Sequence, residues 1–259
     1  MSANSSSSKH LYFSNDCNFP KEYEWYIALG SILSAYNGDY VNDLKTYHHI
    51  KWIENGLSKM WDIKDNETFK DTANWLIEEG HRTKYLPRLD LLKRYRFEIE
   101  NANAFFRILF KMFPDSAISY YQKKNKNHIR DIKNSDNLNY RYFGKLLKIA
   151  IEYLDLYQKN IGDYIQVDSL LAWDAVRLVN ISRWALNCNY INEEEFYYYI
   201  SQIKEPIQNT YDNWQQIALA YATAAIIWYP VNERAKSFPI ILGELLNDER
   251  SLLVTCPFK

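Results

Sequence analysis

The segment that decides the fold is Trp173–Trp184, which reads WDAVRLVNISRW. Most of its residues are Val, Leu, Ile, Ala and Trp, and they occur on every side of the helix that the segment predicts. A helix that is apolar all round is buried, so other elements have to surround it. The sequence therefore predicts one central helix with further helices packed around it.

Helical periodicity continues through the rest of the chain. It predicts helices over about 22–36, 44–60, 66–80, 87–113, 140–159, 168–187, 212–230 and 234–247, with a further helix that Asn192 caps. The chain has only 7 Gly and 7 Pro in 259 residues, and no two segments alternate like paired strands. We expect an all-α fold, a single compact domain of about nine or ten helices over 21–259 with no significant sheet.

Two segments fall outside this pattern. Residues 1–20 are Ser-rich at their start and are expected to form a disordered lead-in. Residues 122–139 are basic and rich in Asn, and are expected to form a loop or hinge. Lys123–Lys133 lies beside several Tyr residues, a pattern that can bind single-stranded nucleic acid. The neutral overall charge and the lack of a nucleic-acid motif favour a solvated loop instead.

Composition excludes several classes of function. Lys and Arg number 31 and Asp and Glu 32, so no net charge draws the chain to nucleic acid or to a membrane. The longest apolar stretch, 217–229, is shorter than the roughly 20 residues that span a bilayer, and predicts a buried helix. The three cysteines are far apart and lack zinc-site spacing. We expect a cytoplasmic protein with reduced thiols, no metal site and no cofactor.

The polar residues of the central helix allow two interpretations. Trp173, Arg177, Asn180 and Trp184 share one stripe of the helix, with Asp174 and Arg183 on either side of it. They form either an internal network, with Asp174 paired to Arg177 and Asn180 bound to a neighbouring backbone, or a polar pocket. In a pocket, Arg177 and Arg183 would bind a carboxylate or phosphate.

A second candidate follows the helix that stops at Gly80. His81 and Arg82 come directly after it, where cationic side chains can cap the free carbonyls of the helix. Alternatively His81 is a general acid or base, oriented by Glu78 or Glu79. His48 and His49 are adjacent and point in different directions on a helix, so they do not favour a shared metal ion.

The order of these segments resembles that of the bacterial domain-of-unknown-function 1266 (DUF1266) family, from about Trp25 to Phe258. The resemblance rests on the following motifs: Ala28-Leu29, Asn37-Gly38, Trp61-Asp62-Ile63, Trp75-Leu76, Gly80-His81-Arg82, Ala172-Trp173-Asp174 with Arg177, Asn180, Arg183 and Trp184, Tyr190–Glu195, Trp214, Tyr221, Trp228, Leu245–Asp248 and Ser251. It implies an all-helical, cytoplasmic bacterial protein. Some members of the family are encoded beside chaperone genes, and others resemble parts of interbacterial conflict systems.

Two hypotheses of function follow. The first is a non-catalytic protein-binding module that acts in conflict or stress, with a toxin or a chaperone-type protein as partner. The Tyr-rich run Phe196–Tyr199 is either part of such a surface or part of the core. The second is an enzyme or toxic effector with a pocket around His81, Asp174, Arg177 and Arg183. There His81 and Asp174 are the catalytic candidates, and the binding candidates are Arg82, Arg177, Asn180, Arg183 and Trp184.

Overall fold

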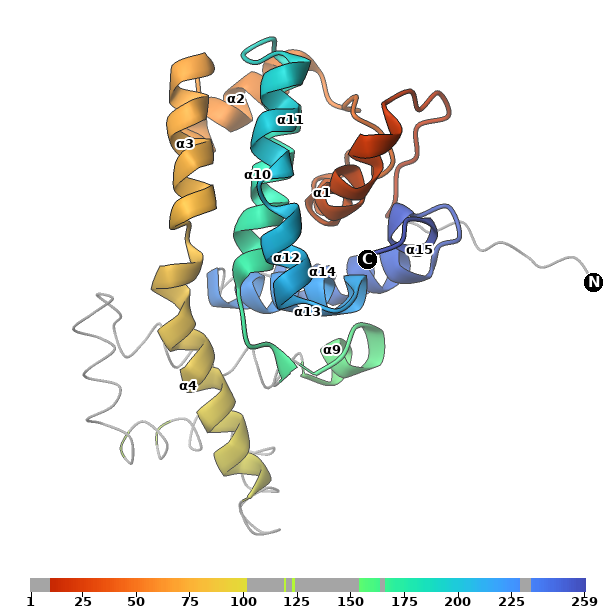
Figure 1. The fold of residues 1–259 in the computed structure, drawn as a ribbon. Helices are drawn as coiled ribbons and strands as arrows, with labels where there is room; N and C mark the ends of the chain where they lie inside the picture. Colours follow the sequence, from red (N-terminus) through yellow and green to blue (C-terminus); the bar gives the residue numbers. More distant parts are fainter. Residues whose placement is uncertain (1–9, 102–118, 120–122, 124–153, 164–165, 229–233) are drawn as a thin grey trace, which may run out of the picture.

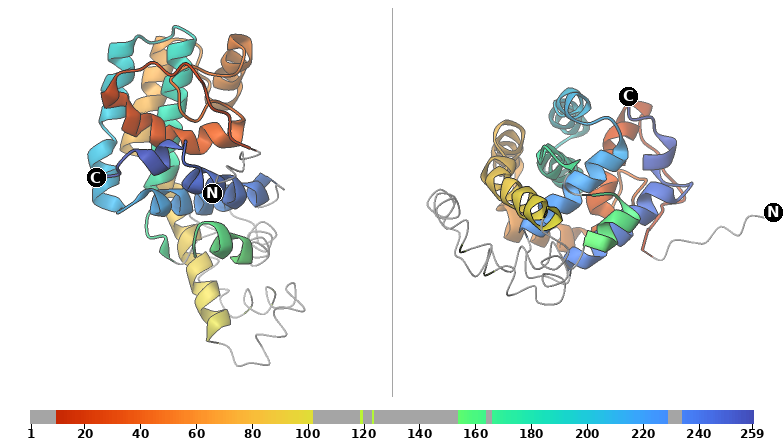
Figure 2. Two further views of the ribbon diagram at one scale, coloured as in Figure 1. Left: turned by 90° about the vertical axis from the view of Figure 1, so that its right-hand side faces the viewer. Right: turned by 90° about the horizontal axis from the view of Figure 1, so that it is seen from below.

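The central helix that the sequence predicts is α10 (Leu171–Asn187) in the computed structural model, which describes residues 10–101, 119, 123, 154–163, 166–228 and 234–259. Every residue of α10 from Ala172 to Ala185 is buried. Seen from below, α10 lies in the middle of the molecule with other helices around it (Figure 2). This surrounding shell accounts for a helix that is apolar on every side.

The shell consists of helices from both halves of the chain (Figure 1). The described elements besides α10 are η1 (Lys21–Tyr23), α1 (Glu24–Asn37), α2 (Ile50–Trp61), α3 (Asn66–Glu78), α4 (Arg82–Glu100), α9 (Leu154–Asn160), α11 (Glu193–Ser201), α12 (Lys204–Thr210), α13 (Trp214–Trp228), α14 (Arg234–Asn247) and α15 (Leu252–Thr255). Helices α1, α2, α3, α4, α11, α12 and α13 all contact α10. The all-α, single-domain fold is therefore confirmed. In the described ranges the one β contact is an isolated bridge between Tyr12 and Tyr40.

Helices α1 and α10 approach each other closely at Gly30. A Cβ atom on Gly30 would lie 2.7 Å from Cγ1 of Val179, so a larger residue would push the two helices apart. At the same crossing the Asn180 side chain donates a hydrogen bond of 2.8 Å to the Gly30 carbonyl. This is the bond to a neighbouring backbone that the internal-network interpretation predicts for Asn180.

Residues 217–228 of the predicted apolar stretch form most of α13 (residue 229 lies outside the described residues), and those from Ile217 to Ile227 are buried, as predicted. No helix in the described part of the chain is long and apolar enough to cross a membrane. Three predicted ends of helices are also confirmed. Gly38 ends α1 in the left-handed conformation, Asn189 has a φ of 58° after α10, and Asn192 forms a capping box with Glu195.

Two helices begin at other residues than predicted. Helix α2 begins at Ile50 and not near 44, because residues 39–49 form a loop around buried polar groups of α1 and α10. Helix α4 begins at Arg82 and not at Pro87, because the Asp174 carboxylate accepts hydrogen bonds from its first backbone groups. Asp168 does not cap α10, which begins three residues later, and its carboxylate instead pairs with Lys93.

The lead-in predicted over 1–20 is too long. Leu11 is buried, the Tyr12 carbonyl accepts a hydrogen bond from Val41, and Ser14 is hydrogen-bonded to Asn42, so residues 10–20 are part of the fold. Residues 1–9 lie outside the described residues. So does the predicted loop or hinge at 122–139, except for Lys123.

Candidate functional site

Asp174 joins three helices at one carboxylate. It is fully buried, and it accepts hydrogen bonds of 3.0 Å from the backbone N–H groups of His81 and Arg82. These groups open α4, so Asp174 caps that helix from another part of the chain and places a negative charge at its N-terminus. Asp174 also pairs with the Arg82 guanidinium at 3.2 Å. The internal-network interpretation pairs Asp174 with Arg177, whereas the structure pairs it with Arg82.

Gly80 makes the approach of Asp174 possible. Its φ is 61°, in the left-handed region that favours glycine. A Cβ atom there would lie 2.2 Å from Oδ2 of Asp174. At that distance the two atoms overlap, so the carboxylate would have to move. The residue that ends α3 is thus also the residue that admits the carboxylate of α10.

Arg82 caps the C-terminus of α3, as the capping interpretation predicts. Its guanidinium donates to the carbonyls of Leu76, Ile77 and Glu78 at 2.7–2.9 Å. These are carbonyls without a partner inside the helix. Asp174 and Arg82 together fix the angle between α3 and α4.

Arg177 lies inside a cluster of tryptophan rings. Its guanidinium carbon is 4.2 Å from the ring centroid of Trp173, 4.7 Å from that of Trp61 and 4.9 Å from that of Trp228. The attraction of a buried cation to each indole face is worth about 1–2 kcal/mol. Arg177 also binds the ring of His81, with 3.1 Å between Nη1 and Nδ1.

The contact with Arg177 determines the protonation of His81. Arginine can only donate, so Nδ1 of His81 accepts and the proton of the neutral ring is on Nε2. Burial lowers the pKa of His81, and the positive charge of Arg177 lowers it further. Asp174, whose Oδ1 lies 3.6 Å from Nδ1, favours the charged form but is outweighed. At neutral pH His81 is thus an uncharged ring with its proton on Nε2.

The buried, cationic environment of His81 predicts that the free energy of unfolding falls as the pH is lowered. The unfolded chain binds a proton on His81 near pH 6.5, whereas the folded protein resists protonation, so stability is fully present above about pH 6.5 and is lost as the pH falls below it. We expect the free energy of unfolding to fall by at most about 1.4 kcal/mol per pH unit from this group. His81→Asn keeps an acceptor for Arg177 but cannot titrate, and should flatten the slope between pH 5 and 6.5.

Urea unfolding at several pH values measures this slope. An unaltered slope in His81→Asn would contradict the assignment of a neutral His81.

Arg183 belongs to a different cluster, at the other end of α10. It is 4% exposed and pairs with the fully buried Asp39 at 3.1 Å. Its remaining N–H groups donate to Ser34 and to the carbonyls of Tyr40, Leu44 and Lys45. All five donors of the guanidinium are engaged, so none is left for a bound anion.

Trp184 joins the same cluster. Its Nε1 donates to Asp39 at 3.3 Å, and its ring meets Trp52 of α2 edge-on. The structure therefore divides the predicted pocket in two. His81, Arg82, Asp174 and Arg177 lie together, whereas Asn180 faces α1, and Arg183 and Trp184 hold the 39–45 loop. Their assignment as catalytic or binding residues stays a prediction.

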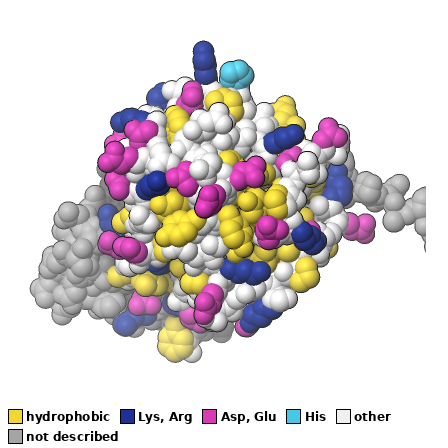
Figure 3. Space-filling view, turned by 45° about the horizontal axis from the view of Figure 1, so that its top comes forward, with side chains coloured by type: hydrophobic (Ala, Val, Ile, Leu, Met, Phe, Trp, Pro, Cys, Tyr) yellow, Lys and Arg dark blue, Asp and Glu magenta, His cyan; other side chains and the backbone are white. Residues whose placement is uncertain are grey.

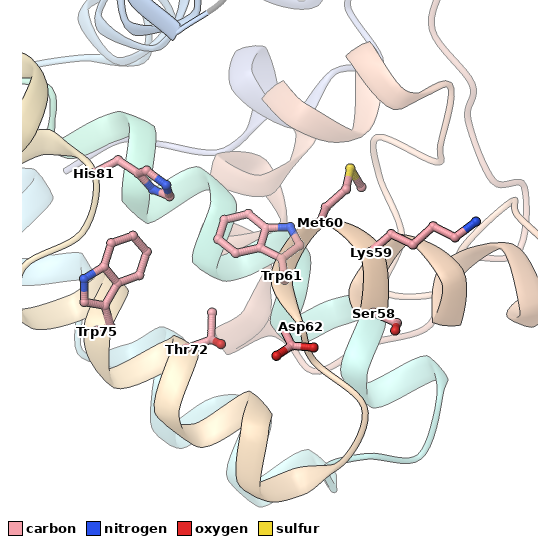
Figure 4. Close-up of a pocket in the computed structure, with 8 residues that line it drawn as sticks. All are labelled: Ser58, Lys59, Met60, Trp61, Asp62, Thr72, Trp75 and His81. Carbon is pink, nitrogen blue, oxygen red and sulfur yellow. The ribbon is translucent and has the colours of Figure 1, made fainter. Parts of the chain in front are cut away.

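A pocket of about 490 Å³ opens beside His81 (Figure 4). It lies between the C-terminal turn of α2 and one side of α3. Its lining residues are Ser58, Lys59, Met60, Trp61, Asp62, Thr72, Trp75 and His81. Among the predicted site residues, His81 alone lines it. The sequence marks Trp61 and Trp75 only as motif residues, because nothing local to either one shows that α2 and α3 place them together.

An exposed aromatic surface was also missed by the sequence analysis. Tyr12, Tyr47, His48 and Trp52 form a connected series of ring contacts, and we call this group the aromatic face. Tyr12 stacks on Tyr47 at 5.3 Å, and His48 stacks on Trp52 at 4.0 Å. Tyr47 is 57% exposed and Trp52 47%. A usable signal was the run of large aromatics among the charged residues Lys45 and Lys51.

The Tyr-rich run Phe196–Tyr199 divides between core and surface. Phe196 and Tyr199 are buried, whereas Tyr197 and Tyr198 are exposed. Figure 3 shows one side of the molecule, on which hydrophobic side chains reach the surface among acidic and basic ones. Within the described ranges no three His, Cys, Asp or Glu side chains are grouped to hold a metal ion, and the three cysteines are unpaired.

Comparison with known proteins places the chain in a family. Residues 56–258 match the family described as protein of unknown function (DUF1266), which covers α10 and every residue of the pocket. No curated protein and no solved structure matches the chain. Because the match extends over well more than half of its length, the chain belongs to the DUF1266 family.

Proposed function

We propose that this protein is a non-catalytic protein-binding module that uses the aromatic face as its contact surface. The observation that carries the proposal is the exposure of Tyr47 and Trp52 together with Tyr12, which is 46% exposed. Tyr and Trp are enriched in the energetic centres of protein interfaces, because they bury a large area and have few rotatable bonds. Stacking of Tyr12 on Tyr47 and of His48 on Trp52 holds these rings in place before a partner binds.

The charges around the aromatic face suggest the chemistry of the partner. Lys45 and Lys51 are exposed beside it, whereas Asp39 and Asp43 of the same loop are fully buried. The exposed charges of residues 39–51 are therefore basic. A folded protein with acidic side chains around an apolar recess is complementary to these charges and to the aromatic face.

The polar residues Asp174 and Arg183 of α10 are already bonded to other parts of the fold, and this supports a binding function over a catalytic one. An enzyme or toxic effector with a site around His81, Asp174, Arg177 and Arg183 needs side chains with free donors or acceptors. The Asp174 carboxylate is buried and bonded to α4, and every donor of Arg183 is in use. These contacts favour roles in the fold for both residues.

We propose a bacterial cytoplasmic protein that acts in conflict or stress, with a toxin or a chaperone-type protein as its partner. This part rests on the family resemblance of the chain, and the following experiment identifies the partner.

The test is affinity purification of the tagged, full-length protein from its source organism, read by quantitative mass spectrometry. We expect one protein at near-stoichiometric yield, and we expect Tyr47→Ala combined with Trp52→Ala to reduce its capture at least about tenfold, because two central aromatic contacts are lost. Tyr198→Ala is the matched control, since Tyr198 is 60% exposed on α11 and lies outside the aromatic face. Equal capture by the double variant and the wild type would refute the proposed surface.

A further inference from the structure

Helix α2 exposes an apolar stripe that continues the aromatic face. Trp52, Gly56 and Met60 are each four residues apart, so they follow one another along one side of the helix. We call these three residues the α2 stripe. Met60 is 63% exposed and Trp52 belongs to the aromatic face, although α2 buries Ile53 and Leu57 completely in the core. The helix therefore carries apolar side chains at the surface in addition to those that it packs against the fold.

Nothing in the described part of the chain requires glycine at position 56. Gly56 lies in the middle of α2, where glycine is less favourable than alanine because it leaves the unfolded chain more freedom. A Cβ atom there would lie 3.4 Å from the Trp184 ring and 3.5 Å from the Met60 methyl group, which are ordinary contact distances. Gly30 differs, because a Cβ atom there would be only 2.7 Å from a side chain of α10. Alanine would fit at position 56, so its absence points to a contact outside the chain.

A glycine on the surface of a helix lets a second helix approach closely. Side chains four residues apart form a ridge, and the side chains of a second helix lie in the grooves beside such ridges. Gly56 interrupts the ridge between Trp52 and Met60, so a side chain of a second helix can lie between them. Gly30 admits Val179 in this way where α1 crosses α10. The rise of the helix separates Trp52 from Met60 by about 12 Å, slightly more than two turns of an opposing helix.

The exposed charges of α2 are positive. Lys51 and Lys59 are exposed and have no ion pair among the described residues, whereas Glu54 is half-buried. Asp62, directly after α2, is paired with Lys64 at 2.5 Å. A partner that carries acidic side chains beside its apolar ones is therefore complementary to this helix.

We infer that the partner contacts the α2 stripe through an α-helix that crosses α2 at Gly56. An apolar side chain of that helix lies between Trp52 and Met60, and acidic side chains beside it face Lys51 and Lys59. A helix suits this surface because α2 offers no free backbone edge to which a strand could be added. This role of the α2 stripe rests on the proposed binding function and specifies the element of the partner that is recognised.

A library of helices tests this recognition without the natural partner. A small three-helix scaffold, displayed on phage and randomised at the exposed positions of one helix, is selected on the full-length protein. We expect enrichment of helices that combine large apolar residues with an excess of Asp and Glu over Lys and Arg. The affinity of each selected scaffold for purified variants of the protein is then measured by fluorescence polarisation.

Gly56→Ala separates recognition from folding. The added methyl group fits the free protein and has the better helix propensity, so the midpoint of thermal unfolding should rise by about 1–4 °C. The same methyl group enters the space between Trp52 and Met60, so the selected helices should bind at least about fivefold more weakly. A glycine with a role in folding alone would not produce these opposite effects.

Two further variants assign the contacts. Met60→Ala should weaken binding at least about fivefold, because an apolar wall of the crossing is lost. Lys59→Glu should weaken it several-fold by repelling the acidic side chains of the selected helix. Phe97→Ala is the matched control, because Phe97 is 62% exposed on α4 and lies outside the α2 stripe. It should bind as the wild type does.

Three results of the selection would overturn the inference. They are no enrichment of any helix, an excess of basic residues in the enriched helices, and wild-type affinity in both Gly56→Ala and Met60→Ala. A dimer in sedimentation experiments that Met60→Ala dissociates would also overturn it, because the α2 stripe would then bind a second copy of the chain.

Failure of the inference is distinguishable from failure of the proposed function. If Tyr47→Ala with Trp52→Ala lowers capture of the natural partner but Gly56→Ala and Met60→Ala do not, the aromatic face binds the partner and the α2 stripe does not. If the double variant captures its partner as the wild type does, the proposed function fails. The affinities of the selected helices then still decide whether the α2 stripe binds a helix.

Discussion

Replacement of Arg183 by Met is expected to lower the free energy of unfolding by about 3–5 kcal/mol. Met retains much of the length of the side chain but leaves Asp39 without its cation. Asp39 is fully buried, and an unpaired charge in that position is costly. The Ser34 hydroxyl and three loop carbonyls lose a donor at the same time. Urea unfolding of the purified variant measures the loss.

A surface pair provides the control for Arg183. Lys64 pairs with Asp62 at 2.5 Å, but both side chains are mostly exposed, at 59% and 82%, so Lys64→Met should leave the free energy of unfolding almost unchanged. Adding Asp39→Asn to Arg183→Met should recover part of the loss, because it removes the unpaired charge. A loss below about 1 kcal/mol in Arg183→Met would mean that the buried pair does not hold the loop.

Gly80→Ala is expected to destabilise the protein by at least about 3 kcal/mol. A left-handed conformation costs a residue with a Cβ atom about 1–2 kcal/mol. The new Cβ atom would also lie 2.2 Å from Oδ2 of Asp174, so the carboxylate has to move away from the backbone groups of His81 and Arg82. Each lost bond to a charged acceptor adds about 1.5–3 kcal/mol.

Gly38→Ala separates these two causes. Gly38 has a φ of 68°, close to that of Gly80, but the nearest atom to a Cβ there is 3.8 Å away. The free energy of unfolding of this variant should therefore fall only by the cost of the left-handed backbone conformation. The difference between the two variants, measured by thermal or urea unfolding, gives the energy of the Asp174 contact. Equal losses in both would show that Asp174 adjusts freely.

Local features of the fold were predictable, and distant ones were not. The capping box of Asn192 and Glu195 involves residues three apart, and the burial of α10 follows from its composition alone. Whether Asp174 belongs to a pocket or to a network depends on Arg82, which is 92 residues away in sequence. The same holds for Arg183, whose loop partners are about 140 residues away. A single sequence shows that such polar groups need partners, but not which partners they have.

The two candidate sites also differ in how far the sequence alone predicts them. The sequence singled out His81 because a histidine directly after a helix stop is conspicuous, and His81 lines the described pocket without Asp174, Arg177 or Arg183. It did not predict the aromatic face, because exposure of Tyr47 and Trp52 depends on how the loop that begins at Asp39 packs against Arg183. The start of α2 was misplaced for the same reason.

We propose that the polar residues of α10 hold the fold and that the aromatic face binds a partner. Hydrogen exchange of the full-length protein, alone and with its captured partner, tests it most directly. We predict new protection in peptides that cover Tyr47 and Trp52, and none in those that cover Tyr197 and Tyr198. Protection limited to α11, or an unchanged exchange pattern around residues 45–55, would contradict the claim.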